Sequence, residues 1–326
     1  ARLTYKPIGD LTIGVTVAGD LNEYNGFHDN DGDGVPDDID FAPLDKSISS
    51  EYDQAIAKLK AETTLTDDQI TEHANIDVRT GLIKDATRGV DQFNIQNETS
   101  RSMVVSADIS YPVIDGEKVR LDVYSHFTQI LGYGSGFAAP GLRLKLGNSF
   151  SLYGEYRNAT KEFMFGYFNS TYDIERAVFV TDPITNKQVA YTRQDRLADI
   201  QTTLNGYYVG ADLNLANIIK AGISYQDLIG ADKYHQRTLR AEAGLAQDLI
   251  PMVSELKAYY FQDNVQDFRD WKTPSTVMGV LLGYNMNGVV MGIDYRFTFK
   301  DLDGSGKIDQ SNETFKTIAF RTRVSF

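Results

Sequence analysis

The final residues of the chain alternate between side chains that suit a bilayer and side chains that suit water. One set is Ile318, Phe320, Thr322, Val324 and Phe326, and the intervening set is Ala319, Arg321, Arg323 and Ser325. A period of two places these sets on opposite faces of a β-strand. The ends of a soluble domain usually fray and have no reason to keep such a period. The pattern therefore predicts a membrane-spanning strand that continues to Phe326.

Segments with the same period recur along the chain. In one of them, Val119 and Val123 share an apolar face, while Arg120 and Asp122 share a polar face. About thirteen such stretches form the repeated, individually weak pattern of a transmembrane β-barrel. Their predicted ranges are 2–7, 10–19, 102–113, 117–129, 140–147, 150–158, 204–215, 219–227, 237–247, 254–263, 276–286, 288–299 and 315–326.

The connections between these segments alternate between short and long. The short ones fall at 8–10, 115–116, 148–149, 217–218, 250–253 and 287–288. Membrane barrels show this alternation, with short periplasmic turns and long external loops. Asn287-Gly288 is in addition a preferred hairpin turn. Tyrosines near strand ends fit an interfacial aromatic girdle: Tyr5, Tyr111, Tyr156, Tyr225 and Tyr284.

These patterns predict an all-β fold, an antiparallel transmembrane β-barrel. The chain resembles bacterial outer-membrane β-barrel proteins, in which the insertion machinery recognises a last strand ending in Phe; the residues that fit are Phe320, Thr322, Val324 and Phe326. A soluble, calcium-stabilised β-sandwich is the alternative fold, because a sandwich would bury the apolar set and expose the other.

The strand count is odd, whereas single-chain bacterial barrels have even numbers. We therefore expect a barrel of about 14 strands, of which roughly 13 lie in this chain and one lies upstream of Ala1. Counting back from Phe326 assigns each connection to one side of the membrane and places the long ones outside the cell.

We expect 1–326 to form a single barrel with two long external connections. The first, 21–100, contains a helix predicted near 50–62 and a second helix that begins at a capping-box pattern, Thr66 with Gln69. This insertion is large enough to form a small cap or plug. The second, 159–201, contains a predicted hairpin that projects beyond the membrane.

An acidic repeat in the first connection carries the strongest local chemistry. It places Asp29, Asp31, Asp33, Asp37 and Asp40 at positions 1, 3, 5, 9 and 12, with Gly34 at position 6 and the Val35 carbonyl at position 7. That spacing suits a hard cation of the size of Ca²⁺, which prefers oxygen ligands. The motif resembles the calcium repeat of thrombospondin type 3 modules, which implies that the five aspartates and the Val35 carbonyl are ligands. The alternative is a flexible acidic loop.

A second candidate calcium loop runs from Asp301 to Glu313. It resembles an EF-hand loop, with ligand positions at Asp301, Asp303, Ser305, Lys307 and Asp309. It departs from that pattern at position 12, where Asn312 replaces the expected glutamate. Glu313 follows one residue later and is the expected ligand in its place, through a distorted turn. We expect both loops to be extracellular, where calcium is abundant enough to occupy weak sites.

Composition narrows the possible functions. The net charge is −13, which argues against nucleic acid as a partner because phosphate binding needs a basic face. The chain has no cysteine, so it has no disulfide or thiolate chemistry. The four histidines are scattered, and catalysis is not expected. The expected partners are the outer-membrane bilayer, calcium and a cell-surface or periplasmic protein.

Two functions remain open. The first is a channel or transporter for small solutes, with a polar lumen gated by 21–100. The second is a non-enzymatic structural or assembly protein whose calcium-ordered loops dock a surface partner. The inward charges could line a selective pore or pair off and close it: Arg120, Arg143, Lys145, Arg157, Arg240, Lys257, Arg296, Arg321 and Arg323 with Asp122, Glu155, Asp212, Glu242 and Asp294.

Overall fold

The computed structural model describes residues 1–83, 92–169, 171–182, 187–246, 249–286, 289–301, 305 and 307–324. The predicted terminal Phe326, the Asn287-Gly288 turn and the predicted ligand Asp303 lie outside this set. The chain forms two compact units. Unit 1 comprises Ala1–Ala18, Val104–Phe165 and Ile200–Phe326, and unit 2 comprises Gly19–Met103 and Gly166–Asp199.

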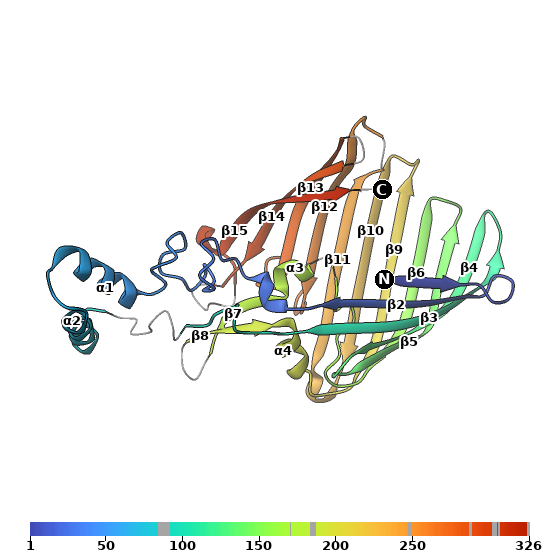
Figure 1. Ribbon diagram of the computed structural model, residues 1–326. Coiled ribbons are helices and arrows are strands. Elements are labelled where there is room, and N and C mark those ends of the chain that lie inside the picture. Colours follow the sequence, from blue (N-terminus) through green and yellow to red (C-terminus); the bar gives the residue numbers. More distant parts are fainter. Residues whose placement is uncertain are drawn as a thin grey trace. The chain divides into compact units, whose positions relative to one another are not determined.

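Unit 1 contains most of a 13-stranded sheet whose strands follow one another in chain order (Figure 1). Its described ladders are antiparallel, so the antiparallel all-β prediction is confirmed. Among the described residues no ladder joins the two edge strands, β1 and β15. The strands are β1 (Arg2–Tyr5), β2 (Thr12–Asp20), β3 (Ser102–Asp115), β4 (Val119–Ile130), β5 (Ser135–Leu146), β6 (Phe150–Ala159), β9 (Leu204–Leu215), β10 (Ile219–Ile229), β11 (His235–Leu245), β12 (Val253–Asp263), β13 (Thr276–Met286), β14 (Val289–Phe299) and β15 (Thr314–Val324).

The predicted start of β5 was wrong. The sequence pattern suggested residue 140, but the strand begins at Ser135. Pro140 has no N–H to donate to a ladder, and the register with β6 shifts between Ala138 and Gly141. A bulge at this point therefore lets the strand continue through a proline that interrupts the alternation.

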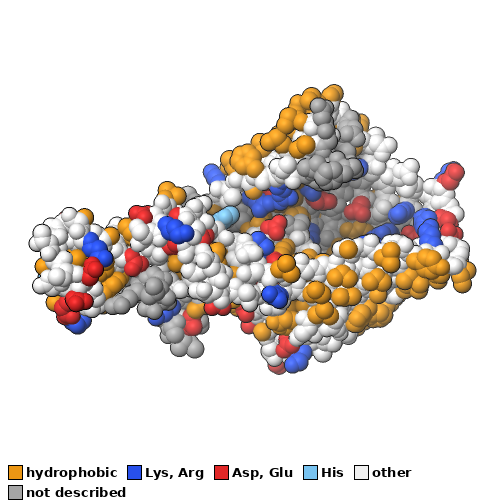
Figure 2. Space-filling model, viewed as in Figure 1, with side chains coloured by type: hydrophobic (Ala, Val, Ile, Leu, Met, Phe, Trp, Pro, Cys, Tyr) orange, Lys and Arg blue, Asp and Glu red, His pale blue; other side chains and the backbone are white. Residues whose placement is uncertain are grey.

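One face of the sheet is apolar and exposed. The register aligns Leu282 of β13, Ile293 of β14 and Phe320 of β15 in one row, and their side chains are 42%, 45% and 77% exposed. Similar rows pair Val119 with Leu146 and Phe127 with Phe137. Figure 2 shows hydrophobic side chains gathered over the strands of unit 1. The predicted outward sets thus form a continuous apolar surface.

The opposite face is polar and more enclosed than the apolar one. Asp294 of β14 is only 1% exposed, and Gln226 of β10 and Gln262 of β12 are likewise buried. Tyrosine rings lie flat on this face where a neighbouring strand has glycine: a methyl group on Gly141 would lie 2.5 Å from the Tyr124 ring. Burial is therefore reversed relative to a soluble protein, in which apolar side chains are the enclosed ones.

Unit 2 combines residues from both long connections. The first contributes η1 (Glu23–Gly26), α1 (Glu51–Glu62) and α2 (Asp67–Thr80), and α2 carries the predicted capping box from Thr66. The second contributes α3 (Tyr172–Glu175), β7 (Ala177–Thr181), β8 (Gln188–Thr192) and α4 (Arg193–Ala198). β7 and β8 pair where a hairpin was predicted. Among the described residues, no helix is long and apolar enough to cross a membrane.

A buried carboxylate joins the two connections within unit 2. Glu23 is fully buried, and its Oε1 accepts hydrogen bonds from the hydroxyls of Tyr167 and Tyr172. Its Oε2 accepts from the backbone N–H of Gln194, 3.1 Å away. Burial, and the bond to Glu23, raise the pKa of the Tyr167 hydroxyl, which therefore stays a donor. Glu23 thus holds 166–199 against the start of the first connection.

An aromatic cluster makes a second junction of the same two connections. The rings of Phe27 and Phe179 stack with centroids 4.4 Å apart, and Phe93 packs edge-on against both. Phe179 belongs to β7, whereas Phe27 and Phe93 belong to the first connection. Such contacts add stability beyond the area that they bury.

Candidate metal site and polar sheet face

The acidic repeat of unit 2 folds into a tight loop around Asp29. Its Oδ1 accepts from the N–H of Gly32 at 2.7 Å, and its Oδ2 accepts from the N–H of Gly34 at 2.9 Å. Both glycines have positive φ, 77° and 96°, which a residue with a side chain rarely adopts. The two glycines therefore allow the backbone to wrap around one carboxylate.

Three of the predicted ligands come together in this loop. Carboxylate oxygens of Asp29, Asp31 and Asp33 all lie within 4.8 Å of one another. Asp31 Oδ2 and Asp40 Oδ2 are buried and have no hydrogen-bond partner among the described residues. Burial raises the pKa of the Asp40 carboxyl, and the like charges of Asp33 and Asp31 raise it further. Orphaned oxygens among crowded carboxylates fit a hard cation such as Ca²⁺.

Two other predicted ligands of this loop, Asp37 and Val35, make hydrogen bonds within the loop. Both oxygens of Asp37 accept hydrogen bonds from Asn30, one from its backbone N–H at 2.9 Å and one from its side-chain amide at 2.6 Å. Val35 is buried, and its N–H donates to Asp33 Oδ1 at 2.7 Å. Asp29, Asp31 and Asp33 are thus the predicted ligands whose carboxylate oxygens lie close enough together to share one cation.

The rest of the first connection holds this loop from outside. The side-chain amide of Asn94 donates to the carbonyl of Asp33 at 3.2 Å, and the N–H of Ile95 donates to the carbonyl of Gly34 at 2.9 Å. Lys46 Nζ donates to the carbonyl of Gly32 at 2.9 Å. Because Asn94 follows Phe93 directly, the loop is tied to the aromatic cluster of unit 2.

The second candidate loop is built differently. The Glu313 carboxylate is buried and accepts from the N–H groups of Asp309 and Gln310, capping the short helix η4 (Ser311–Glu313). The Ser305 hydroxyl donates to the carbonyl of Lys307 at 3.2 Å, and Asp301 Oδ1 accepts from the N–H of Ser305. Several of the predicted ligands therefore bond to one another here.

The charges on the polar sheet face form ion pairs both within a strand and between neighbouring strands. Asp294 Oδ2 lies 2.7 Å from Arg296 and 2.9 Å from Arg321, while the hydroxyl of Tyr259 donates to its Oδ1 at 2.7 Å. Asp294 therefore connects β12, β14 and β15. It is one of several inward carboxylates that bind an inward arginine, as Asp122 does with Arg120.

A second cluster surrounds Arg157 of β6. Its guanidinium lies 2.7 Å from Glu155 and donates to the side chain of Gln226 on β10. The ring of Tyr208 lies 3.9 Å from its central carbon, a cation–π distance. His126 of β4 packs edge-on against the Phe165 ring, with ring centroids 6.1 Å apart. These contacts explain how so polar a face is enclosed.

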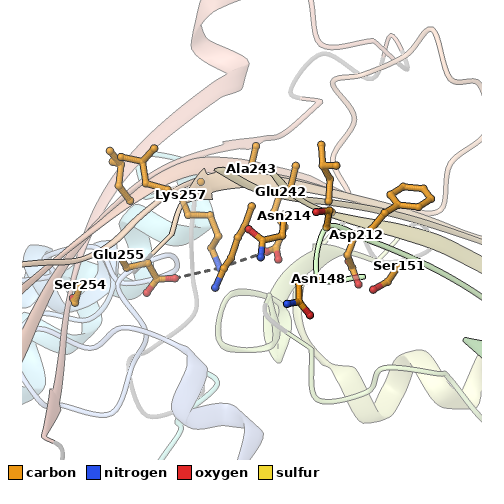
Figure 3. A pocket seen from close by; sticks show the side chains of 18 residues that line it. Asn148, Ser151, Asp212, Asn214, Glu242, Ala243, Ser254, Glu255 and Lys257 are labelled. Carbon is orange, nitrogen blue, oxygen red and sulfur yellow. Dashed lines mark ion pairs between the residues drawn. The ribbon is translucent and has the colours of Figure 1, made fainter. Parts of the chain in front are cut away.

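A hollow of about 420 Å³ opens on the polar face at the end of β6 and β9–β12 that bears the short turns. Figure 3 shows Asp212, Glu242 and Lys257 projecting from one side of the sheet, whereas Ala243 projects from the other. Lys257 lies 3.5 Å from Glu242 and 3.4 Å from Glu255. The alternation of apolar and polar residues predicted that Asp212, Glu242 and Lys257 face inward. It did not predict the hollow, because the hollow depends on the register of the four ladders that join β6 and β9–β12.

Comparison with known proteins adds one distant likeness. No protein-family model matches the chain, and no curated protein matches it. A solved structure of a mutant ferric enterobactin receptor from Pseudomonas aeruginosa aligns with a TM-score of 0.32 and 12% sequence identity. The alignment covers 69% of this chain and 37% of the receptor, so the chain spans little more than a third of that protein.

Proposed function

We propose that the chain is a bacterial outer-membrane β-barrel that passes small solutes through a polar lumen, with the long connections and both candidate calcium loops on the extracellular side. The reversed burial of the sheet carries this proposal: apolar rows such as Leu282, Ile293 and Phe320 are exposed, while Asp294 is enclosed. Lipid is the solvent that such an outer face requires, and a closed sheet satisfies its backbone groups there.

The same observation weighs against the soluble sandwich. A sandwich needs a second sheet to cover the apolar face. Among the described residues the other sheet is the two-stranded β7–β8 pair, which belongs to unit 2. Extraction of the native protein without detergent would support the sandwich and reject the barrel.

Conductance across a planar bilayer tests the channel. The first connection can be excised cleanly because its ends are bonded: the N–H of Glu23 donates to the carbonyl of Ser100 at 2.8 Å, and the N–H of Ser100 donates to Asn22 Oδ1 at 3.1 Å. Replacing 26–96 by a short glycine–serine linker should leave the sheet intact. We expect ion conductance in the full chain, in the excised variant, or in both.

The excised variant identifies the gate. Higher conductance after excision assigns gating to the first connection. If neither protein conducts while both migrate as folded, heat-modifiable species on electrophoresis, the channel is rejected. The assembly hypothesis then takes its place, because unit 2 has its own core and could dock a partner; loss of that docking in chelator would support it.

Calcium binding is the second part of the proposal, and Asp31→Asn tests it. Asparagine keeps the Oδ1 that accepts the N–H of Asp33 at 3.1 Å but replaces the orphaned Oδ2 by an amide. We expect calcium to protect residues 28–49 from proteolysis. Loss of one charged ligand should weaken calcium binding about tenfold or more.

Asp38→Asn is the matched control, since Asp38 is exposed and falls at no ligand position. It should leave the calcium titration unchanged. Equal loss in both variants, or equal proteolysis with calcium and with chelator, would contradict a calcium site in this loop.

A further inference from the structure

The hollow on the polar sheet face has a floor of glycine between charged side chains. In the register, Gly222 of β10 lies between Asp212 of β9 and Glu242 of β11. One row closer to the short turns, Gly244 of β11 lies between Lys220 of β10 and Lys257 of β12. Two carboxylates therefore face each other across one glycine, and two ammonium groups face each other across the next.

The first of these glycines leaves room between the carboxylates. A methyl group on Gly222 would lie 3.1 Å from Asp212 Oδ1 and 3.8 Å from Cγ of Glu242. Both acidic side chains therefore lean over Gly222 from opposite sides. The space above it is part of the hollow of about 420 Å³, which is large enough for a molecule of amino-acid or dipeptide size.

The charges in the hollow differ in how well they are neutralised. Lys257 lies between Glu242 and Glu255, within 3.5 Å of each. Neither Asp212 nor Lys220 makes a side-chain hydrogen bond or ion pair with the part of the chain that the structure describes, although the positive charge of Arg143 acts on Asp212 from a greater distance. They stand diagonally on neighbouring strands, a separation of about 7 to 8 Å between such positions. One negative and one positive group are thus available to a ligand.

Two buried polar atoms in the lining are also unsatisfied. Asn214 Oδ1 and Ser254 Oγ have no hydrogen-bond partner among the described residues, although the Asn214 amide donates to Asn217. Buried polar atoms normally have partners, so each of these atoms has capacity for a ligand group.

We propose that this hollow binds a small zwitterion, an amino acid or dipeptide carrying both an ammonium and a carboxylate group. Asp212 receives the ammonium group and Lys220 receives the carboxylate. A solute with one charge would leave the opposite protein group unpaired, which lowers its affinity. The proposal names a solute class for the proposed channel and rests on that function, since the solute reaches the polar face through the lumen.

Calorimetric titration of the full chain in detergent tests this with glycylglycine, N-acetylglycylglycine and glycylglycinamide. The last two lack the ammonium and the carboxylate charge, respectively. We expect glycylglycine to bind about tenfold more tightly than either, because each charged contact contributes about that factor. Asp212→Asn and Lys220→Gln should each remove this preference. The double exchange Asp212→Lys with Lys220→Asp should bind better than either reversal alone.

Matched controls are Glu117→Gln and Lys118→Gln, which remove the same charges at the short turn before β4. They should not change binding. Equal affinity for glycylglycine and glycylglycinamide would show that the hollow recognises only the ammonium group, which would overturn the proposal. The absence of binding would overturn it as well.

Conductance measured on the same preparation separates the two hypotheses. Binding without conductance keeps the zwitterion site and rejects the channel. Conductance without binding keeps the channel and rejects the site.

Discussion

Asp294→Ala is expected to destabilise unit 1 by about 3 to 5 kcal/mol, the usual cost of removing one partner from a buried ion pair. The carboxylate is almost fully buried and binds Arg296, Arg321 and the hydroxyl of Tyr259. The largest part of the loss comes from Arg296, whose own side chain is mostly buried and would keep its charge without a partner. Urea unfolding followed by the fluorescence of Trp271, the single tryptophan, measures the change.

Asp122→Ala is the control for that experiment. Asp122 and Arg120 also lie two residues apart on one strand, but the Arg120 side chain is 40% exposed. Because Arg120 reaches solvent and keeps its ion pair with Asp115, we expect a cost of about 0 to 1 kcal/mol. Equal destabilisation by the two variants would show that enclosure of the polar face does not determine the cost.

Glu23→Ala should open unit 2 by detaching 166–199 from the first connection. The variant leaves the hydroxyl of Tyr167 and the N–H of Gln194 without their buried acceptor, whereas the hydroxyl of Tyr172 keeps its bond to Asp20 Oδ2 at 2.9 Å. Hydrogen bonds to charged groups contribute about 1.5 to 3 kcal/mol each, so we expect a loss of at least about 3 kcal/mol. Hydrogen exchange of 171–182 and 187–199, followed by mass spectrometry, reports the opening.

Two further variants sharpen this test. Glu23→Gln keeps one carbonyl oxygen that can accept from the tyrosines, but its NH2 group then faces the N–H of Gln194, and two donors cannot bond to each other, so its exchange should be intermediate. Glu98→Ala removes an exposed carboxylate from the same connection and should leave exchange unchanged. Unchanged exchange in Glu23→Ala would contradict the role of Glu23 as the junction.

The strands could be predicted because their signal is local. Whether a position is apolar, like Met291, or polar, like Asp294, depends only on the face of the sheet to which it points. The observed strands therefore follow the predicted ranges closely. Pro140 interrupts the alternation, and the predicted start of β5 was wrong there. The bulge that lets the strand continue past the missing N–H of Pro140 depends on pairing with β6, which the sequence of β5 alone does not show.

The candidate sites divide in the same way. The spacing from Asp29 to Asp33 is local, so the sequence predicted a cluster of carboxylates there. Glu313 shows the limit, because the spacing does not reveal that its carboxylate accepts from the N–H groups of Asp309 and Gln310 and so caps η4. Glu23 and the hollow above Gly222 carry no sequence signal, since both arise from strand register or from contacts across long stretches of chain.

The junction at Glu23 also sets the order in which the protein can fold. Tyr167 lies 144 residues after Glu23, and the strands of 104–165 belong to unit 1 between them. Neighbouring hairpins such as β3–β4 close over short distances and lose little chain entropy, whereas contacts so distant in sequence form slowly. Until Tyr167 and Gln194 reach the first connection, the carboxylate of Glu23 therefore remains in water. Unit 2 is consequently a late product of folding, completed only after the hairpins encoded between its halves have formed.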